Sequence, residues 1–165
     1  MSIEFFCEDV EKPRVKYIAL RKWIKDVVEE HKKTVGKISF VFCSDEHLLK
    51  MNNEYLKHDY YTDVLTFDNT EDDKISGEVY ISVDRVAENA KTYSTEDTEI
   101  FRVVIHSVLH MLGYDDTTPE SQEQMRAAED KCLAMPGFKN CKCSLDISEL
   151  IPNIAGFIGI QNISY

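Results

Sequence analysis

The chain lacks the features that mark several special classes of protein. No stretch approaches the roughly 18–20 consecutive apolar residues that a membrane span requires. Residues 1–13 are acidic and contain no basic region followed by an apolar run, so a secretory signal is not expected. The sequence also has no internal repeats. We therefore expect a cytoplasmic protein that does not associate with a membrane.

The chain also lacks the two cysteine pairs that mark many structural zinc sites. The five cysteines are odd in number and scattered, and a single C-x-C pair is formed by Cys141 and Cys143. Structural zinc sites usually contain two such pairs, or cysteines combined with histidines. We therefore expect reduced thiols, some of them buried as small apolar groups.

Positive charge is scarce and unevenly spread. The net charge is -11, yet residues 1–57 carry 11 Lys and Arg against 10 Asp and Glu, whereas residues 58–165 carry 8 against 20. An acidic total argues against nonspecific coating of nucleic acid. A local basic stretch, which is either a solvated helix face or a phosphate contact, is formed by Lys12, Arg14, Lys16, Arg21, Lys22 and Lys25.

The length of 165 residues suits one domain, and the pattern of apolar residues predicts an α+β fold. We expect a mixed sheet of about four strands with helices packed on it. The expected strands cover 3–7, 37–43, 63–67 and 77–82. The expected helices cover 14–33, 45–55, 84–91 and 119–133, and a further central helix begins at a cap on Thr95 or Asp97 and stops at Gly113.

The central helix carries the pattern that indicates chemistry. His106 and His110 are one helical turn apart and so lie on one face, where two imidazoles can bind one Zn²⁺ ion. Gly113 permits a left-handed turn that brings the chain back, and Asp116 could then supply an oxygen ligand. Two nitrogens and a carboxylate leave a fourth position for water, as in catalytic zinc sites. Asp115 is an alternative third ligand, although the spacing favours Asp116.

Two histidines four residues apart can also be hydrogen-bonded core residues, and this is the better interpretation of a bare H-x-x-x-H. The strongly apolar helix, the glycine stop and the two carboxylates that follow favour a metal site. Ser107 stands where the H-E-x-x-H metalloproteases have their general base, so a protease of that type is not expected. The sequence identifies no base, and either another residue supplies it or the metal-activated water reacts with little help.

Three blocks of sequence together resemble the YbeY family of bacterial endoribonucleases and rRNA maturation factors. The first is His106-Ser-Val-Leu-His110-Met-Leu-Gly-Tyr-Asp-Asp116, which is similar to the family's H-G-x-L-H-L-x-G-Y-D-H. The others are Met51-Asn-x-x-Tyr55 followed by Thr62-Asp-Val-Leu-Thr-Phe67, and Gly77-Glu-Val-Tyr-Ile-Ser82. The likeness covers roughly residues 1–134 and implies a metal-dependent hydrolase domain there. Residues 135–165 form a C-terminal tail without a counterpart and of unknown role.

The resemblance implies a zinc-dependent endoribonuclease that cuts single-stranded RNA in rRNA maturation and ribosome quality control. It implies one Zn²⁺ per chain on His106, His110 and Asp116, and the ribosomal small subunit and its associated factors as partners. Asp63 and Asp115 are candidates for orienting a ligand imidazole.

Two positions depart from the family pattern. Asp116 stands where the family usually has His, which lowers the positive charge of the site and shifts its preference toward harder ions. Leu56 stands where the family has Arg. Lys57 and His58 are nearby cations that could bind RNA phosphates instead, although a Lys cannot make the two-pronged contact of Arg. They can equally be ordinary loop residues.

Two other functions stay open on the sequence alone. The domain could be a non-catalytic ribosome-assembly factor with a structural metal, which Leu56 in place of Arg favours somewhat. It could also be a metal-dependent hydrolase of another substrate, such as a small ester or amide.

Overall fold

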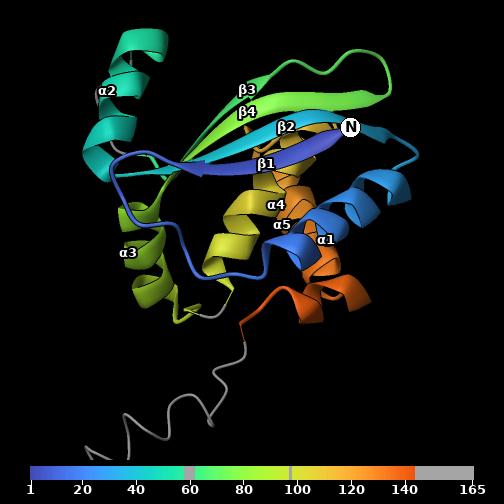
Figure 1. Ribbon diagram of the computed structural model, residues 1–165. Helices are drawn as coiled ribbons and strands as arrows, with labels where there is room; N and C mark the ends of the chain where they lie inside the picture. Colours follow the sequence, from blue (N-terminus) through green and yellow to red (C-terminus); the bar gives the residue numbers. More distant parts are fainter. Residues whose placement is uncertain (58–61, 97, 144–165) are drawn as a thin grey trace, which may run out of the picture.

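The computed structural model describes residues 1–57, 62–96 and 98–143. Its strands are β1 (Ser2–Cys7), β2 (Thr34–Cys43), β3 (Val64–Asp68) and β4 (Lys74–Ser82). Its α-helices are α1 (Tyr17–Glu30), α2 (Asp45–Leu56), α3 (Val83–Tyr93), α4 (Glu99–Met111) and α5 (Pro119–Leu133), and a 3₁₀ turn covers Pro136–Asn140. Figure 1 shows the sheet above α1, α4 and α5. None of the helices in these ranges is long and apolar enough to cross a bilayer.

The sheet is mixed, with the strand order β1-β2-β4-β3. β1 pairs with β2 and β2 with β4 in parallel, and β3 runs antiparallel to β4 at the edge. The prediction of one α+β domain with a mixed four-stranded sheet and packed helices is therefore confirmed. Both β2 and β4 begin three residues earlier than expected, because their pairing continues past an irregularity between Val35 and Ile38.

One face of the sheet carries the main hydrophobic core. Trp23 of α1 is fully buried there, and its indole N–H donates to the carbonyl of Cys132 at the end of α5 over 2.9 Å. The core continues beyond residue 134, because Phe138 and Cys141 are buried against the same cluster. This packing connects α1 with the end of α5 and with the 3₁₀ turn that follows it.

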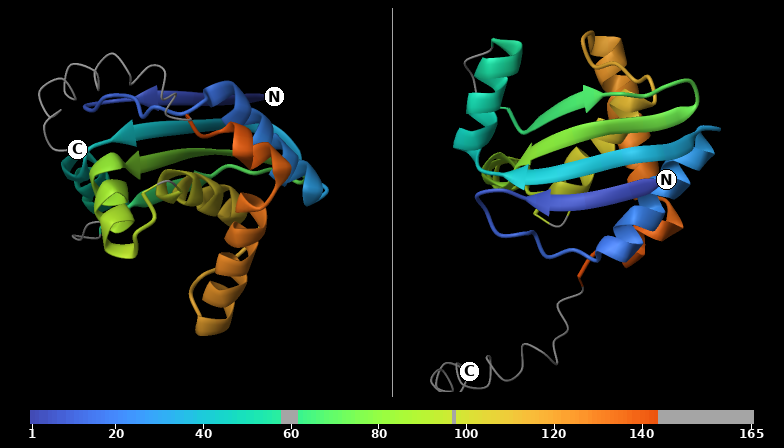
Figure 2. Two further views of the ribbon diagram at one scale, coloured as in Figure 1. Left: turned by 90° about the horizontal axis from the view of Figure 1, so that it is seen from below. Right: turned by 45° about the horizontal axis from the view of Figure 1, so that its top comes forward.

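Helix α5 extends past the β3 edge of the sheet, as both views in Figure 2 show. Helix α4 packs against β3 and β4 and also contacts α5. The exposed face of α4 is therefore enclosed between an edge strand and a projecting helix. A cleft forms at that place.

The helix ends follow from local chemistry. Ser44 is the N-cap of α2, and its side chain accepts a hydrogen bond from the backbone N–H of His47. Helix α5 begins with a capping box between Thr118 and Ser121 and has Pro119 in its first turn. Thr98 precedes α4, while Asp97, the alternative cap, lies outside the described residues.

Candidate metal centre

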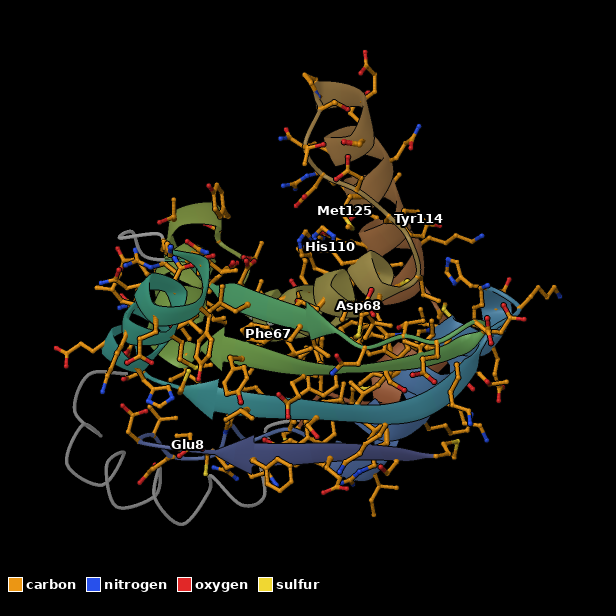
Figure 3. The ribbon with its side chains drawn as sticks, turned by 90° about the horizontal axis from the view of Figure 1, so that it is seen from above. Glu8, Phe67, Asp68, His110, Tyr114 and Met125 are labelled. Carbon is orange, nitrogen blue, oxygen red and sulfur yellow. The ribbon has the colours of Figure 1, made fainter. Side chains whose placement is uncertain are left out.

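Helix α4 presents a polar stripe on an otherwise buried helix. Arg102, His106 and His110 follow one another at four-residue steps and so share one face. The imidazoles are partly buried, with 23% and 30% of their side-chain surface exposed for His106 and His110. Their ring centroids are 4.6 Å apart, and Figure 3 shows His110 beyond the β3 edge, between α4 and α5. The rings are therefore turned toward the cleft and not into the core.

The turn after α4 brings a carboxylate back to the two rings. Gly113 has a φ of +104°, a conformation that residues with a side chain rarely adopt. The following Tyr114 is held from the other side, because its hydroxyl lies 3.0 Å from Nε2 of His31. Asp116 then returns to the site, and its Oδ2 lies 3.4 Å from Nε2 of both His106 and His110.

The neighbouring carboxylate is directed elsewhere. Asp115 is exposed and accepts a hydrogen bond from the hydroxyl of Thr117 over 2.5 Å. This contact with Thr117 holds the pKa of Asp115 below its ordinary value. Of the two carboxylates that the sequence left open as a third ligand, the structure brings Asp116 to the imidazoles.

Hydrogen bonds at Nδ1 fix which way both rings face. Nδ1 of His106 donates to Oε2 of Glu129 over 2.9 Å, and Nδ1 of His110 donates to the carbonyl of Tyr114 over 3.1 Å. A neutral imidazole that carries its proton on Nδ1 has a lone pair on Nε2. Both Nε2 lone pairs therefore point into the space that Asp116 also faces.

This arrangement fits a metal ion. The two Nε2 atoms are 3.0 Å apart, so the two lone pairs and the carboxylate require either a shared proton or a metal ion between them. Ligand atoms about 2.0–2.1 Å from a tetrahedral zinc ion are themselves about 3.3–3.4 Å apart, close to the separations seen here. Within the described residues, His106, His110 and Asp116 form the group of donor side chains that could hold a metal ion.

Glu129 and Arg102 support His106 from behind. The Glu129 side chain is 8% exposed, and its second oxygen accepts from Nη1 of Arg102 over 3.0 Å. Nη2 of Arg102 donates to Asp130 over 2.9 Å. Burial raises the pKa of Glu129, but the hydrogen bonds from His106 and Arg102 outweigh burial and hold it below its ordinary value.

The contacts between Glu129 and His106 raise the pKa of the His106 imidazole. Burial lowers the pKa of His106, but the hydrogen bond to Glu129 and the negative charges of Glu129, Asp116 and Asp63 outweigh it. The net effect is a pKa above the ordinary value for histidine. Glu129 therefore acts as the carboxylate partner that commonly orients a metal-bound imidazole.

Glu129 and Arg102 were not identified from the sequence. Arg102 precedes His106 by four residues and so continues the stripe of the two histidines. Glu129 lies on the buried face of α5 with Met125 and Cys132. An acidic residue on a buried helix face is rare unless it is paired, and this was the available indication.

Asp63 does have a place near the site, but not the expected one. It lines the cleft together with His106, whereas the hydrogen-bond acceptors at Nδ1 of the two histidines are Glu129 and Tyr114. Burial raises the pKa of Asp63, and the positive charge of His106 opposes this.

Two lobes of the cleft meet at the candidate centre. Their volumes are about 690 Å³ and 570 Å³, and both are lined by His106, Asp116, Arg126 and Glu129. The larger lobe continues along the first turns of α5, and the smaller lobe continues toward the end of α3. An extended polymer could therefore pass the donor group with parts on either side of it.

The basic residues singled out in the sequence lie away from these lobes. Lys57 ends α2 with a φ of 55° and is exposed, and it does not line either lobe; His58 lies outside the described residues. On α1, Lys22 pairs with Asp26, and the Nε of Arg21 donates to the carbonyl of Ile3. Three other residues of the basic stretch, Lys12, Arg14 and Lys16, are exposed and precede α1.

Known proteins are similar to this chain in sequence and in fold. Residues 6–137 match the family described as endoribonuclease YbeY. The chain is 46% identical to an endoribonuclease YbeY of Parabacteroides distasonis, over 82% of this chain and 96% of that protein. It is 45% identical to an endoribonuclease YbeY of Porphyromonas gingivalis strain W83, over 81% of this chain and 89% of that protein. A solution structure of a Thermotoga maritima protein is similar with a TM-score of 0.57 and 26% identity, over 80% and 89%.

Proposed function

This chain belongs to the endoribonuclease YbeY family, and on that premise we propose that it cuts single-stranded RNA at a zinc ion held by His106, His110 and Asp116. The observation that carries the proposal is the convergence of two Nε2 lone pairs and one carboxylate oxygen beside an open cleft. Three protein ligands leave a fourth position for water, which is the arrangement of catalytic zinc and not of structural zinc.

A bound zinc ion would lower the pKa of its water and polarise a phosphoryl oxygen of the substrate. The protein contributes orientation. Glu129 and the carbonyl of Tyr114 keep the protons of both imidazoles on Nδ1, so that Nε2 faces the cleft. The hydrogen bonds from His106 and Arg102 hold the pKa of Glu129 below its ordinary value, and Arg102 also binds the second oxygen of Glu129. Asp63 lines the cleft together with His106, and burial raises the pKa of its carboxyl group.

The finer features of the function are part of the same proposal. We infer that the substrate is rRNA undergoing maturation, that the small ribosomal subunit and its associated factors are partners, and that the enzyme acts in the cytoplasm. The catalytic domain would comprise residues 1–134 together with Phe138 and Cys141, which are buried in the same core. No function is assigned to residues 135–165. Lys57 would contact the RNA backbone outside the cleft, where an exposed cation can contribute to phosphate binding. His58 would contribute to the same binding.

Asp116 distinguishes this centre from one with three histidines. A carboxylate adds one negative charge and an oxygen donor, so the site should accept harder divalent ions such as Mn²⁺ more readily. Elemental analysis of the protein as purified would identify the ion.

The decisive experiment compares two adjacent carboxylates. Asp116→Ala removes a proposed ligand, whereas Asp115→Ala removes the same charge one residue away from a side chain that contacts Thr117 instead. We expect Asp116→Ala to lose bound metal and the cleavage of single-stranded RNA, and Asp115→Ala to keep both. Undiminished metal in Asp116→Ala would refute the ligand set. Undiminished cleavage by a metal-free Asp116→Ala protein would refute metal-dependent catalysis.

A further inference from the structure

The smaller lobe of the cleft contains an exposed aromatic ring beside the candidate metal centre. Tyr93 is the last residue of α3, lines this lobe and is 69% exposed. The chain after Tyr93 has a defined course. Ser94 ends the helix with a φ of 54°, and the hydroxyl of Thr95 donates to the carboxylate of Glu99 at the start of α4. An exposed ring at a fixed helix end offers a face on which a nucleic-acid base can stack.

An amide lies one helical turn before this ring. Asn89 also lines the lobe, and its spacing of four residues puts it on the same face of α3 as Tyr93. Across the described ranges, the side chain of Asn89 has no hydrogen-bond partner, although it is partly buried. An amide carries both donors and an acceptor, which suits the edge of a base.

Phosphate binding in this lobe needs a cation, because its walls are acidic. The carboxylates that line it are Asp63, Glu99, Asp116 and Glu129. Of its two guanidinium groups, that of Arg102 is engaged by Glu129 and Asp130. Arg126 is exposed, lines both lobes and forms no ion pair or hydrogen bond with any residue in the described part of the chain. A guanidinium can bind two phosphate oxygens at once.

From these three side chains we propose that the smaller lobe is a nucleotide-binding subsite beside the cleavage point. The base stacks on Tyr93, the amide of Asn89 contacts the edge of the base, and Arg126 binds the phosphate that connects this nucleotide to the metal centre. The volume of about 570 Å³ lies within the roughly 300–1,000 Å³ of ordinary ligand clefts. The ligand class, single-stranded RNA, rests on the proposed function.

The stacking contact is tested by binding, which does not require cleavage. Fluorescence anisotropy with a labelled single-stranded RNA should show that Tyr93→Ala weakens binding by about 5- to 100-fold, as the loss of one base–aromatic stack does. Tyr93→Phe keeps the ring and should bind within about twofold of wild type. Tyr55→Ala is the matched control, because Tyr55 is 64% exposed at the end of α2 and lines neither lobe.

The phosphate contact is tested by salt dependence. Arg126→Gln should weaken binding and reduce the slope of log affinity against log salt by about 0.7, the value for one phosphate contact on a single strand. Lys131→Gln removes the same charge from the same helix but from a residue that lines neither lobe, so it should leave the slope nearly unchanged. Asn89→Ala should change the preference among homopolymeric RNAs.

Several results would overturn the subsite. Equal RNA affinity of Tyr93→Ala and Tyr55→Ala is one, and an unchanged salt slope in Arg126→Gln is another. If Tyr93→Ala lost bound metal, its weaker RNA binding would be explained by damage to the metal centre, and this result would also overturn the subsite. A wild-type protein that binds RNA through Tyr93 and Arg126 but never cuts it would refute the proposed function and support the subsite.

Discussion

The substitution Glu129→Gln tests whether a buried carboxylate behind His106 controls metal affinity. Glu129 accepts one hydrogen bond on each oxygen, from Nδ1 of His106 over 2.9 Å and from Nη1 of Arg102 over 3.0 Å. A glutamine has the same shape but one acceptor oxygen, and so its NH₂ group must face one of these two donors. The substitution therefore breaks one of the two contacts and removes the negative charge next to His106.

Loss of such an orienting partner typically weakens metal binding by about 10- to 100-fold, which is about 1.4–2.7 kcal/mol. Proton competition partly opposes this loss. Glu129 raises the pKa of His106, so its removal makes the imidazole easier to deprotonate. The loss of affinity should therefore be larger at pH 8 than at pH 6, because proton competition for His106 weakens as the pH rises.

Competition with a chromogenic chelator at both pH values measures the affinity. Asp130→Asn is the matched control, because Asp130 is the other partner of Arg102, is 60% exposed and does not contact His106. A surface ion pair of this kind contributes about 0–1 kcal/mol, so the control should bind metal within about twofold of wild type. Equal affinity of Glu129→Gln and wild type at pH 8 would refute the orienting role.

Three further outcomes are expected. Zinc at about 100 times its dissociation constant should add about 2.7 kcal/mol to the free energy of unfolding in urea, and His110→Ala should abolish this gain; an equal gain in His110→Ala would contradict the site. In metal-free protein with chelator, the raised pKa of His106 stabilises the folded state fully below the pKa of the unfolded chain, about 6.5, and this stabilisation is lost as the pH rises through the pKa of the folded state. Urea titrations from pH 5 to 9 should show that the free energy of unfolding falls over this range. The same pH dependence in a His106→Gln variant would exclude this explanation. Gly113→Ala should lower stability by about 1–2 kcal/mol from backbone strain alone, because a Cβ there meets no atom within 4 Å while φ is +104°; an unchanged urea midpoint would show that the turn tolerates a side chain.

The elements of the fold could be predicted because their patterns are local. Period-two and three-to-four-residue spacing of apolar side chains reports whether a segment has one buried face, whatever lies against that face. Element ends were less accurate. Helix α1 begins at Tyr17 and not at Arg14, and the early start of β2 depends on its pairing with β4, which is absent from the local sequence.

The candidate centre also has one part that the local sequence predicts and another that depends on tertiary packing. His106, His110 and Asp116 lie within eleven consecutive residues, so one helix and one glycine turn bring them together. The sequence predicted this group but left Asp115 as an alternative, and the structure brings Asp116 to the rings. The remainder depends on how distant segments pack. Glu129 reaches His106 because α5 packs on α4 across 23 residues of chain, a contact no local spacing encodes.

The cleft is equally a product of tertiary structure. Tyr93 and Arg126 line one lobe although 33 positions separate them, because α3 and α5 flank the same face of α4. The sequence contained both residues, but it did not indicate that they face a common space. Backbone geometry within one turn is set by a few neighbouring residues, whereas the orientation of two packed helices depends on all the side chains buried between them.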